Sequence, residues 1–404
     1  MRQWKKEFGG NLESTYDMLI SLCVSIAVLA LLTNKPNVYL VVGVVFAFVF
    51  LSKMYDKYVG HGITLVNKRR TYRLFPGDEV EMDLRLQNSS RLPIINGKFQ
   101  FYANHVIQND RFFTVGHKKT NLYEIPLSII DKGDAAVSVN MKAQKRGVTR
   151  LNEIEYHFPH LMSFENITLF FRDFYRTEFI IYPTPLPVKG LEERFHVTIG
   201  SQRTTFSPFE DQLSPIGTRD YLPSDPFHRI NWKASARIQS LQTKLYERVH
   251  DITWVFVVNI SESTRMRNTY VSHNIENILS YVTYMCQFAT EKGYAYEIHI
   301  NARKAGSPPY FYLHEGIGKE HLRHALEFLA RVNTEELILP YENLLYRVDQ
   351  DLYKPKTLFL FGEVTPEAEM YARTWEKKRM SVYHIKEYEE GAYLGDVVKE
   401  VAAQ

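Results

Sequence analysis

The hydrophobic and polar positions follow three different periodicities along the chain. Near the beginning, residues 18–34 and 38–52 form two apolar runs without a charged side chain. Further on, apolar and polar side chains alternate, as at Val80, Met82 and Leu84, which is typical of half-buried strands. In the last part, continuous apolar runs alternate with helical spacing. The pattern therefore predicts a helical hairpin, a β-rich region and an α/β region, in this order.

Each of the two apolar runs is long enough to cross a thin hydrocarbon core at about 1.5 Å per residue. Tyr16, Tyr39 and Tyr55 stand at their edges, where amphipathic rings prefer to lie, and 34–37 is a polar connector. We expect transmembrane helices at about 16–34 and 38–54, within a segment 1–60 that also holds an N-terminal tail. The alternatives are a cleaved signal peptide, which lacks a small-residue cleavage site here, and a hairpin buried in a soluble protein.

Basic residues gather on the outer ends of this hairpin. Only Lys35 lies in the connector, and the others flank the two runs: Arg2, Lys5, Lys6, Lys53, Lys57, Lys68, Arg69 and Arg70. The positive-inside rule then puts both termini and the soluble domains in the cytoplasm. The sequence predicts a multi-pass protein of the cell membrane.

The region 61–187 is predicted to be a small β-sandwich or open barrel. Turn residues such as Pro76, Gly77 and Asp78 separate its alternating runs. Further strand-like runs are 97–102, 149–158, 167–172 and 178–182.

The region 251–404 is predicted to be a doubly wound α/β domain. Ile252–Ile260 is a continuous apolar run of the kind that is buried in a parallel sheet. A helical pattern follows it and stops at Gly293, and Thr365 with Pro366 has the chemistry of a helix start. Further strands are expected at 294–300, 357–361 and 381–385, and a further helix near 322–332.

Between these regions, the segment 188–250 holds a dense group of charged and aromatic residues. Asp225 is predicted to cap a helix that has Pro226 at its first position and continues through Arg237. Arg229, Lys233 and Arg237 would then share one helical face. That face can bind a phosphate or an acidic partner, or it can belong to an internal ion-pair network. The counter-charges of such a network are Asp220, Asp225 and Glu247.

This segment resembles the central motif of the bacterial domain of unknown function 58 family. The matching residues are Arg219, Tyr221, Asp225, Arg229, Ile230, Trp232, Lys233, Ser235, Ala236 and Arg237, while Ser224 stands where the family usually has a glycine. The resemblance implies a von Willebrand factor A-like domain over 251–404. It also implies a MoxR-type AAA+ ATPase as protein partner, with membrane-bound transglutaminase-like proteins as frequent genomic companions.

A von Willebrand factor A-like domain binds a divalent cation through an Asp-x-Ser-x-Ser loop after its first strand. The matching positions are Asn259, Ser261 and Ser263, so the carboxylate is replaced by a neutral amide. The strongest attraction for Mg²⁺ is then missing. This degenerate loop is either a weak metal site or a purely structural loop. Glu363, which follows a later predicted strand, is a carboxylate that can supply the missing negative charge.

Composition narrows the possible functions. The net charge of +3 does not indicate nucleic acid as a partner, and two cysteines do not build a disulfide framework. No Gly-x-Ser-x-Gly, Walker or His-Glu-x-x-His motif is present, and His321 with His324 fits no standard zinc spacing. We expect no cofactor and no catalytic residue. A membrane-tethered scaffold or adaptor is the main hypothesis, and the alternative is a cryptic metal-dependent or hydrolytic enzyme that uses the Arg219–Arg237 cluster or the Asn259 loop.

Overall fold

A computed structural model of the 404-residue chain forms two compact units. Unit 1 comprises 1–184 with 329–333, and unit 2 comprises 185–328 with 334–404. The described residues are 3–9, 12–33, 36–116, 119–130, 132–160, 166–195, 210–223, 225–248, 253–263, 269–333, 337–388 and 391–397.

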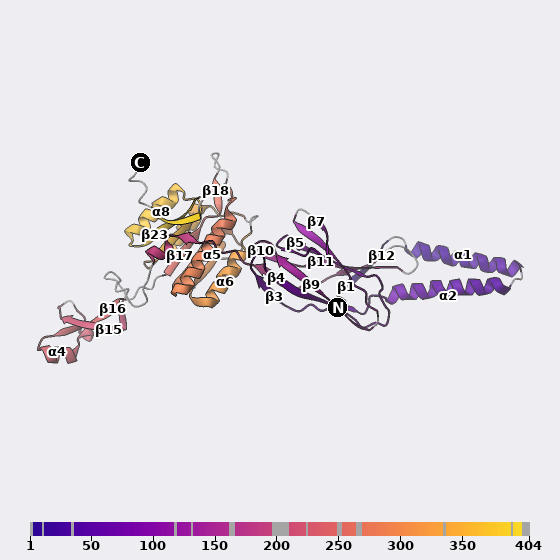
Figure 1. Ribbon diagram of the computed structural model, residues 1–404, viewed down its shortest axis with the longest axis horizontal. Coiled ribbons are helices and arrows are strands. Elements are labelled where there is room, and N and C mark those ends of the chain that lie inside the picture. Colours follow the sequence, from indigo (N-terminus) through magenta and orange to yellow (C-terminus); the bar gives the residue numbers. More distant parts are fainter. Residues whose placement is uncertain are drawn as a thin grey trace. The chain divides into compact units, whose positions relative to one another are not determined.

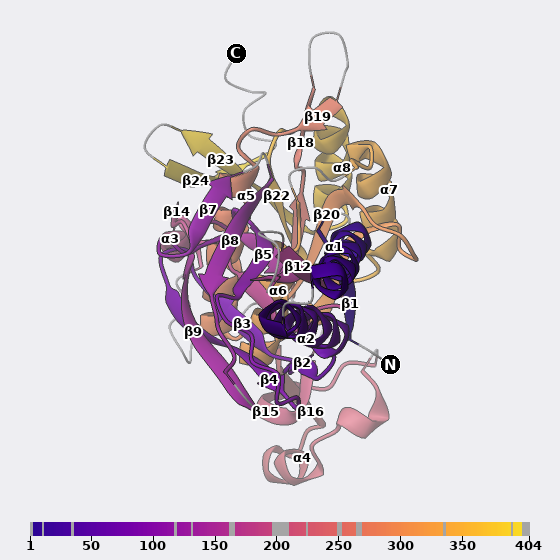
Figure 2. The ribbon, with the colours of Figure 1, turned by 90° about the vertical axis from the view of Figure 1, so that its right-hand side faces the viewer.

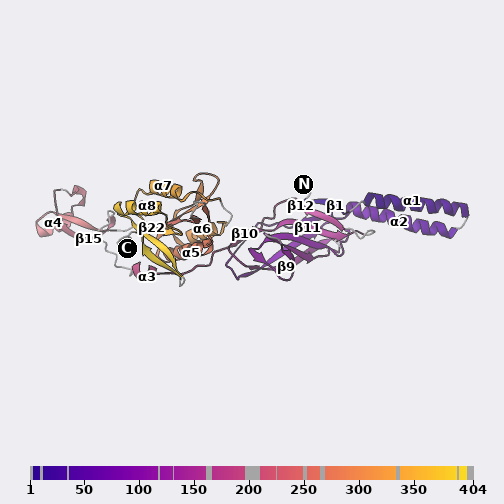
Figure 3. The same ribbon diagram turned by 90° about the horizontal axis from the view of Figure 1, so that it is seen from above.

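Unit 1 contains two long helices that lie side by side, α1 (Leu12–Thr33) and α2 (Pro36–Tyr58). Figure 1 and Figure 3 show the pair from two directions. In the part of the chain that the structure describes, one helix is long and apolar enough to cross a membrane, over Tyr39–Tyr58. The apolar stretch of α1 is shorter, Tyr16–Leu29, so a second crossing stays a prediction. The basic residues Arg2 and Lys35 lie outside the described residues.

The rest of unit 1 consists of β-sheets, as the alternating pattern predicts. A six-stranded antiparallel sheet has the order β1-β12-β11-β5-β8-β7, and a four-stranded antiparallel sheet has the order β2-β4-β9-β6. Side chains from both sheets share one core, which includes Met82, Leu84, Phe99 and Tyr156. A three-stranded sheet, β10-β13-β3, completes the unit. The bounds are β1 Trp4–Phe8, β2 Ile63–Leu65, β3 Thr71–Leu74, β4 Glu79–Asn88, β5 Lys98–Asn104, β6 Ile107–Gln108, β7 Phe113–Gly116, β8 Thr120–Pro126, β9 Gly133–Ala143, β10 Gly147–Arg150, β11 Asn152–Pro159, β12 Asn166–Phe171 and β13 Glu178–Ile181.

Strand β1 departs from the sequence prediction, which treats residues before the helices as a tail. Trp4–Phe8 pairs antiparallel with β12, with Trp4 opposite Phe171. Trp4 is the buried side chain of the strand, and Lys5, Glu7 and Phe8 are exposed. With one buried position, the strand has no period-two signal that the sequence could reveal.

Unit 2 contains a mixed, mostly parallel sheet of seven strands in the order β14-β24-β23-β22-β17-β20-β21. The central strands β23, β22, β17 and β20 are parallel, while β21 and β24 are antiparallel to their neighbours. This confirms the coarse α/β prediction. The bounds are β14 Val188–Lys189, β17 Thr253–Val258, β20 Ala295–Arg303, β21 Tyr310–Gly316, β22 Thr357–Phe361, β23 Ser381–Tyr388 and β24 Gly391–Asp396.

Helices cover both faces of this sheet because its strands are apolar on both sides. Trp254 stacks on Phe288 of α5 (Ile275–Lys292), while the next residue, Val255, packs in the core with α7 (Tyr341–Asp351) and α8 (Pro366–Lys377). Figure 2 shows α7 and α8 next to each other. The predicted caps of α5 at Gly293 and of α8 at Thr365 are confirmed. Two further helices of unit 2 are α3 (Leu191–Arg194) and α6 (Gly318–Ala330).

The signature residues form a small module with its own two-stranded sheet. Strand β15 (Glu210–Asp220) pairs antiparallel with β16 (Gln242–Arg248). Between them lie a 3₁₀ turn, η1 (Phe227–Arg229), and a short helix, α4 (Trp232–Ile238). We call residues 210–223 and 225–248 the signature module.

Candidate functional site

The signature module does not contain the helix that its sequence predicts. Asp225 caps no helix, Pro226 is in extended conformation, and α4 begins at Trp232. Asn231 is its N-cap, and the Asn231 side chain accepts a hydrogen bond from the Ala234 amide at 3.2 Å. Because Arg229 lies outside α4, the predicted common face of Arg229, Lys233 and Arg237 is wrong.

Asp225 instead links the segment between β15 and β16 to both strands, through Arg219 on β15 and Thr243 on β16. Both guanidinium NH groups of Arg219 donate to its carboxylate, at 2.8 and 2.7 Å. The Leu222 amide donates to the same carboxylate at 3.0 Å, and the Thr243 hydroxyl donates to it at 3.1 Å. The hydrogen bonds from Arg219 are the largest cause that holds the pKa of Asp225 at about 2. The described part of the module therefore contains one internal ion pair, Arg219–Asp225, while the Asp220 carboxylate accepts from the neutral Gln242 side chain at 2.6 Å.

The other signature residues divide between the interior of the module and its surface. Ile230 and Ser235 are buried, and Tyr221 packs its ring 6.0 Å from that of Phe227. Ser235 donates to the Asn231 carbonyl and accepts from the Gln242 amide. Ala236 is exposed, and Arg229 is half-buried. Ser224 and the side chain of Glu247 lie outside the described part.

A group of large side chains on the module faces solvent. Phe227 is 75% exposed and Trp232 is 67% exposed, and Lys233 and Arg237 of α4 are exposed too. Among the described residues no ion pair engages Lys233 or Arg237. Further exposed apolar side chains are Leu222, Ile238, Leu241 and Leu245. The module thus exposes both aromatic and cationic side chains to solvent, and the ring of Phe227 also contacts that of Tyr221.

The Asn259 loop is held by hydrogen bonds of its own. The amide oxygen of Asn259 accepts from the Ser261 amide at 3.0 Å, the Ser261 hydroxyl at 2.6 Å and the Asn301 amide group at 2.8 Å. Its NH₂ group donates to the Glu363 carbonyl at 2.9 Å. The oxygen that a cation would need already has three donors, so this geometry favours the structural reading of the loop. Ser263 is exposed at the end of the loop.

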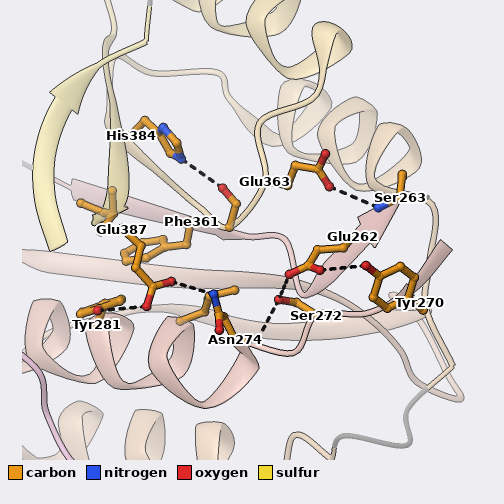
Figure 4. Close-up of a pocket in the computed structure, with 13 residues that line it drawn as sticks. Glu262, Ser263, Tyr270, Ser272, Asn274, Tyr281, Phe361, Glu363, His384 and Glu387 are labelled. Atoms are coloured by element: carbon orange, nitrogen blue, oxygen red, sulfur yellow. Dashed lines mark hydrogen bonds between the residues drawn. The ribbon is translucent and has the colours of Figure 1, made fainter. Parts of the chain in front are cut away.

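A pocket of about 380 Å³ lies beside this loop, at the carboxyl ends of β17, β22 and β23. Strand β17 has β20 on one side and β22 on the other, which makes this edge the place where the strand order reverses. Figure 4 shows the polar groups around the pocket. The lining residues are Glu262, Ser263, Tyr270, Ser272, Asn274, Ile278, Tyr281, Phe361, Gly362, Glu363, His384, Ile385 and Glu387.

The three carboxylates of the pocket accept hydrogen bonds from neutral groups. Glu262 accepts from the Tyr270 and Ser272 hydroxyls, and Glu363 accepts from the Ser263 amide at 3.2 Å. Glu387 accepts from the side-chain amides of Asn274 and Asn277 and from the Tyr281 hydroxyl. Sequence reasoning missed Glu262 and Glu387. Their positions at strand ends are the only signal in the sequence.

Two other polar clusters could not be predicted from the sequence, because each brings together residues that are far apart along the chain. In unit 1, Tyr16, Asp56 and His160 are buried and hydrogen-bonded to one another. In unit 2, Lys356 pairs with Glu297 at 3.0 Å and with Glu315 at 3.1 Å. His321 is one of the two histidines whose spacing fits no standard zinc site. Its Nε2 atom lies 2.9 Å from the Tyr296 carbonyl oxygen. In the described part of the chain no three His, Cys, Asp or Glu side chains are placed to hold a metal.

Comparisons with known proteins give no family. No protein-family profile and no curated protein matches the chain. Solved structures match parts of it. A family 123 glycoside hydrolase from Clostridium perfringens is 14% identical over 34% of this chain and 26% of its own, with a TM-score of 0.17. The seventh ScaB type I cohesin of Pseudobacteroides cellulosolvens is 12% identical over 31% of this chain and 94% of its own, with a TM-score of 0.19.

A third match is a ScaB cohesin of R. flavefaciens in complex with a group 1 dockerin, 12% identical over 30% of this chain and 94% of its own, with a TM-score of 0.17. The chain spans about a quarter of the glycoside hydrolase that it matches. TM-scores this low carry no argument about the fold or the function of this chain.

Proposed function

We propose that this chain is a membrane-tethered adaptor of the domain of unknown function 58 family, and that its signature module docks on a protein partner in the cytoplasm. The exposed aromatic side chains of Phe227 and Trp232, and the exposed cationic side chains of Lys233 and Arg237, carry this proposal. Aromatic and cationic side chains dominate the binding energy of protein interfaces. Exposed groups of large apolar side chains with polar neighbours mark interaction sites on protein surfaces.

The partner is a MoxR-type AAA+ ATPase, as the family resemblance implies, and the role is in assembly at the cell envelope. Unit 2 is a von Willebrand factor A-like domain in this proposal. Its alternating strands and helices, with the pocket at the switch point, agree with that fold. The Asn259 loop then has a structural role, because its amide oxygen is already saturated by donors.

The tether consists of two crossings, by α1 and α2. The pairing of β1 with β12 supports this, because it keeps residues 4–8 and 166–171 on the same side of the membrane. A chain that begins and resumes on one side crosses an even number of times. If α2 crosses, α1 must cross as well, even though its apolar stretch is shorter.

The test is a pull-down of the tagged full chain from membranes with and without ATP. We expect an AAA+ ATPase to be retained in a nucleotide-dependent manner, and the pair of changes Phe227→Ser and Trp232→Ser to remove it. Tyr353→Ser is the matched control, since Tyr353 is 79% exposed outside the signature module. Equal loss with the control variant would contradict docking through the module.

The alternative function is a hydrolytic or metal-dependent enzyme at the Arg219–Arg237 cluster or the Asn259 loop. Turnover of a phosphoester or a peptide by the purified chain, abolished by Arg229→Ala, would replace the adaptor with this enzyme. The closed Arg219–Asp225 pair and the saturated Asn259 oxygen support the adaptor instead.

A further inference from the structure

The helices α1 and α2 meet the β-sheets of unit 1 at one end, which three buried side chains define. Tyr16 of α1 and Asp56 of α2 are hydrogen-bonded to His160, the residue that follows β11. All three side chains are buried. Since α2 is the proposed membrane tether, on which this inference rests, the end of the sheets at His160 faces the bilayer.

A ribbon of two chain segments reaches the same end from neighbouring strands. Lys98 at the start of β5 lies opposite His157 of β11 and opposite the end of β8. The residues before Lys98 and those after β8 therefore run alongside the residues that follow His157. Ile94 and Ile129 exchange both backbone hydrogen bonds, at 2.7 and 2.8 Å, so the pairing continues to the level of His160.

A hydrogen bond joins this ribbon directly to α2. The Tyr55 hydroxyl donates to the Pro93 carbonyl at 2.6 Å. Tyr55 comes three residues after Ser52, the last residue of the uncharged run, which is about 4.5 Å along the helix axis. The headgroup layer on each side of the hydrocarbon core is about 5–7 Å thick. Pro93 and its neighbours therefore lie at the depth of the lipid headgroups.

Two isoleucines of this ribbon face away from the core of unit 1. Ile95 is 61% exposed and Ile130 is 77% exposed, while the residues before them, Ile94 and Ile129, are buried in that core. Alternation along an extended chain explains the difference, because one face of the ribbon packs on the sheets and the other points outwards. Large apolar side chains that are exposed among polar neighbours mark interaction sites.

The chemistry of this end of unit 1 favours a lipid surface as the partner. Phe8, the last residue of β1, and Tyr58, the last residue of α2, are 44% and 47% exposed. Lys57 and Arg91 are exposed as well. Asp131, which lies outside the described residues, is the single acidic residue of the segments 89–97 and 127–132. Aromatic rings prefer the membrane interface, and basic side chains are attracted to the anionic lipids of the cytoplasmic leaflet.

We infer that Ile95 and Ile130 insert into the cytoplasmic surface of the bilayer, so that unit 1 contacts the membrane at a second place besides its helices. The boundary between lipid headgroups and acyl chains accepts apolar side chains to a depth of about 5–10 Å. Contact through the ribbon as well as through α1 and α2 fixes the orientation of unit 1 relative to the membrane.

The test is lipid quenching of a dye on the full chain, reconstituted in vesicles of phosphatidylcholine and phosphatidylglycerol. A thiol-reactive dye is attached to Ile95→Cys or Ile130→Cys, and some lipids carry a nitroxide on a shallow acyl carbon. We expect the nitroxide to lower the emission about twofold or more at both positions, because the dye lies at the depth of the quencher. Cys23 and Cys286 are buried, and the chain without an added cysteine gives their background.

Phe174→Cys is the matched control within unit 1. Phe174 is 83% exposed and comes three residues after the end of β12 that pairs with Trp4, away from the helices. Its dye should not be quenched. Phe48→Cys, at an exposed apolar position of α2, reports on the tether itself. Quenching at position 48 without quenching at 95 and 130 would overturn the insertion of the ribbon and leave the tether standing. Absence of quenching at 48 would overturn the tether and the insertion together.

A charge at one isoleucine should affect the other. In the chain that is labelled at position 130, Ile95→Asp should remove most of the quenching, because a carboxylate is costly to place among acyl chains. Both positions are exposed, so the change leaves the core of unit 1 intact. Phe174→Asp is the control and should leave the quenching as it is. Full quenching in the Ile95→Asp chain would contradict insertion through Ile95.

Discussion

At the scale of single residues, Asp225 shows how one carboxylate can organise a loop. Its pKa of about 2 lies below its ordinary value of 3.8, first because Arg219 donates to it and then because the Leu222 amide does. A lowered pKa means that the folded module prefers the charged form. The pair therefore stabilises the module fully above about pH 3.8, and this contribution is lost as the pH falls towards 2.

We predict that Arg219→Gln raises the pKa of Asp225 towards 3.8. Removal of the guanidinium group takes away the largest cause of the shift, while the Leu222 amide still donates. The measurement is a pH titration of the aspartate carboxyl carbons by NMR, in wild type and variant. Lys233→Gln is the control, because Lys233 has no contact with Asp225 and should leave the titration unchanged.

Gly362 is a second residue whose identity the structure explains. Its φ is +84°, and a Cβ atom there would lie 2.1 Å from the carbonyl oxygen of Asn259. We predict that Gly362→Ala lowers the free energy of unfolding of unit 2 by about 2 kcal/mol or more, since both backbone strain and a clash are introduced. Urea unfolding followed by the fluorescence of the buried Trp254 and Trp375 measures this loss.

Gly293→Ala is the matched control for that change. Gly293 also has a positive φ, +73°, but no atom lies within 4 Å of the position of an added Cβ. Backbone strain alone should cost about 1 kcal/mol. If both variants lose the same amount, the close approach of Gly362 to the Asn259 loop does not matter for stability.

At the scale of secondary-structure elements, α4 depends on its cap. The helix has seven residues, too few to be stable alone, and Asn231 satisfies one of its first amides. We predict that Asn231→Ala speeds the hydrogen exchange of the Ser235–Ile238 amides about fivefold, as the loss of a cap of about 1 kcal/mol implies. Asn231→Ser keeps an acceptor oxygen and should exchange like the wild type.

The sequence predicts strands well where a continuous apolar run marks them, and helices well where a cap marks their start. Strands β17, β22 and β23 and the start of α8 at Thr365 and Pro366 are of this kind. The helix predicted from Asp225 failed because two residues there are equally good caps. Tertiary contact decides between them, since Arg219 and Thr243 occupy the Asp225 carboxylate and leave Asn231 to cap.

The candidate site is less predictable than the fold, for a reason of distance along the chain. Glu262, Glu363 and Glu387 come from three separate segments, and no local pattern relates them. Only the order of the strands in the sheet brings them to one pocket. The Asn259 loop was visible in the sequence because its three positions lie within five residues, but Asn301, which completes its hydrogen bonds, lies on the next strand of the sheet.

At the scale of the whole molecule, the pairing of β1 with β12 makes the topology testable. We predict that a reporter after Gln404 and a tag before Trp4 both behave as cytoplasmic. Strand pairing keeps residues 4–8 on the same side of the membrane as the β-sheets of unit 1. A cysteine in place of Lys35 should react with a membrane-impermeant thiol reagent added from outside.

Cys23 and Cys286 serve as internal controls, since both are buried and should stay unlabelled in intact cells. An external N-terminal tag together with a cytoplasmic C-terminal reporter would mean a single crossing by α2. That result would also require β1 to be unpaired in the membrane-bound protein.

The short strand β14 determines when unit 2 can be completed during synthesis. Val188–Lys189 pairs with Ala392 and Tyr393, about 200 residues later in the chain. Arg194 likewise donates a hydrogen bond, at 2.8 Å, to Asp396, which is synthesised about 200 residues later. Contacts of such long sequence separation form late and slowly. A ribosome making this protein therefore exposes the apolar strands of unit 2 for most of their synthesis, while unit 1, except for its segment 329–333, can already fold.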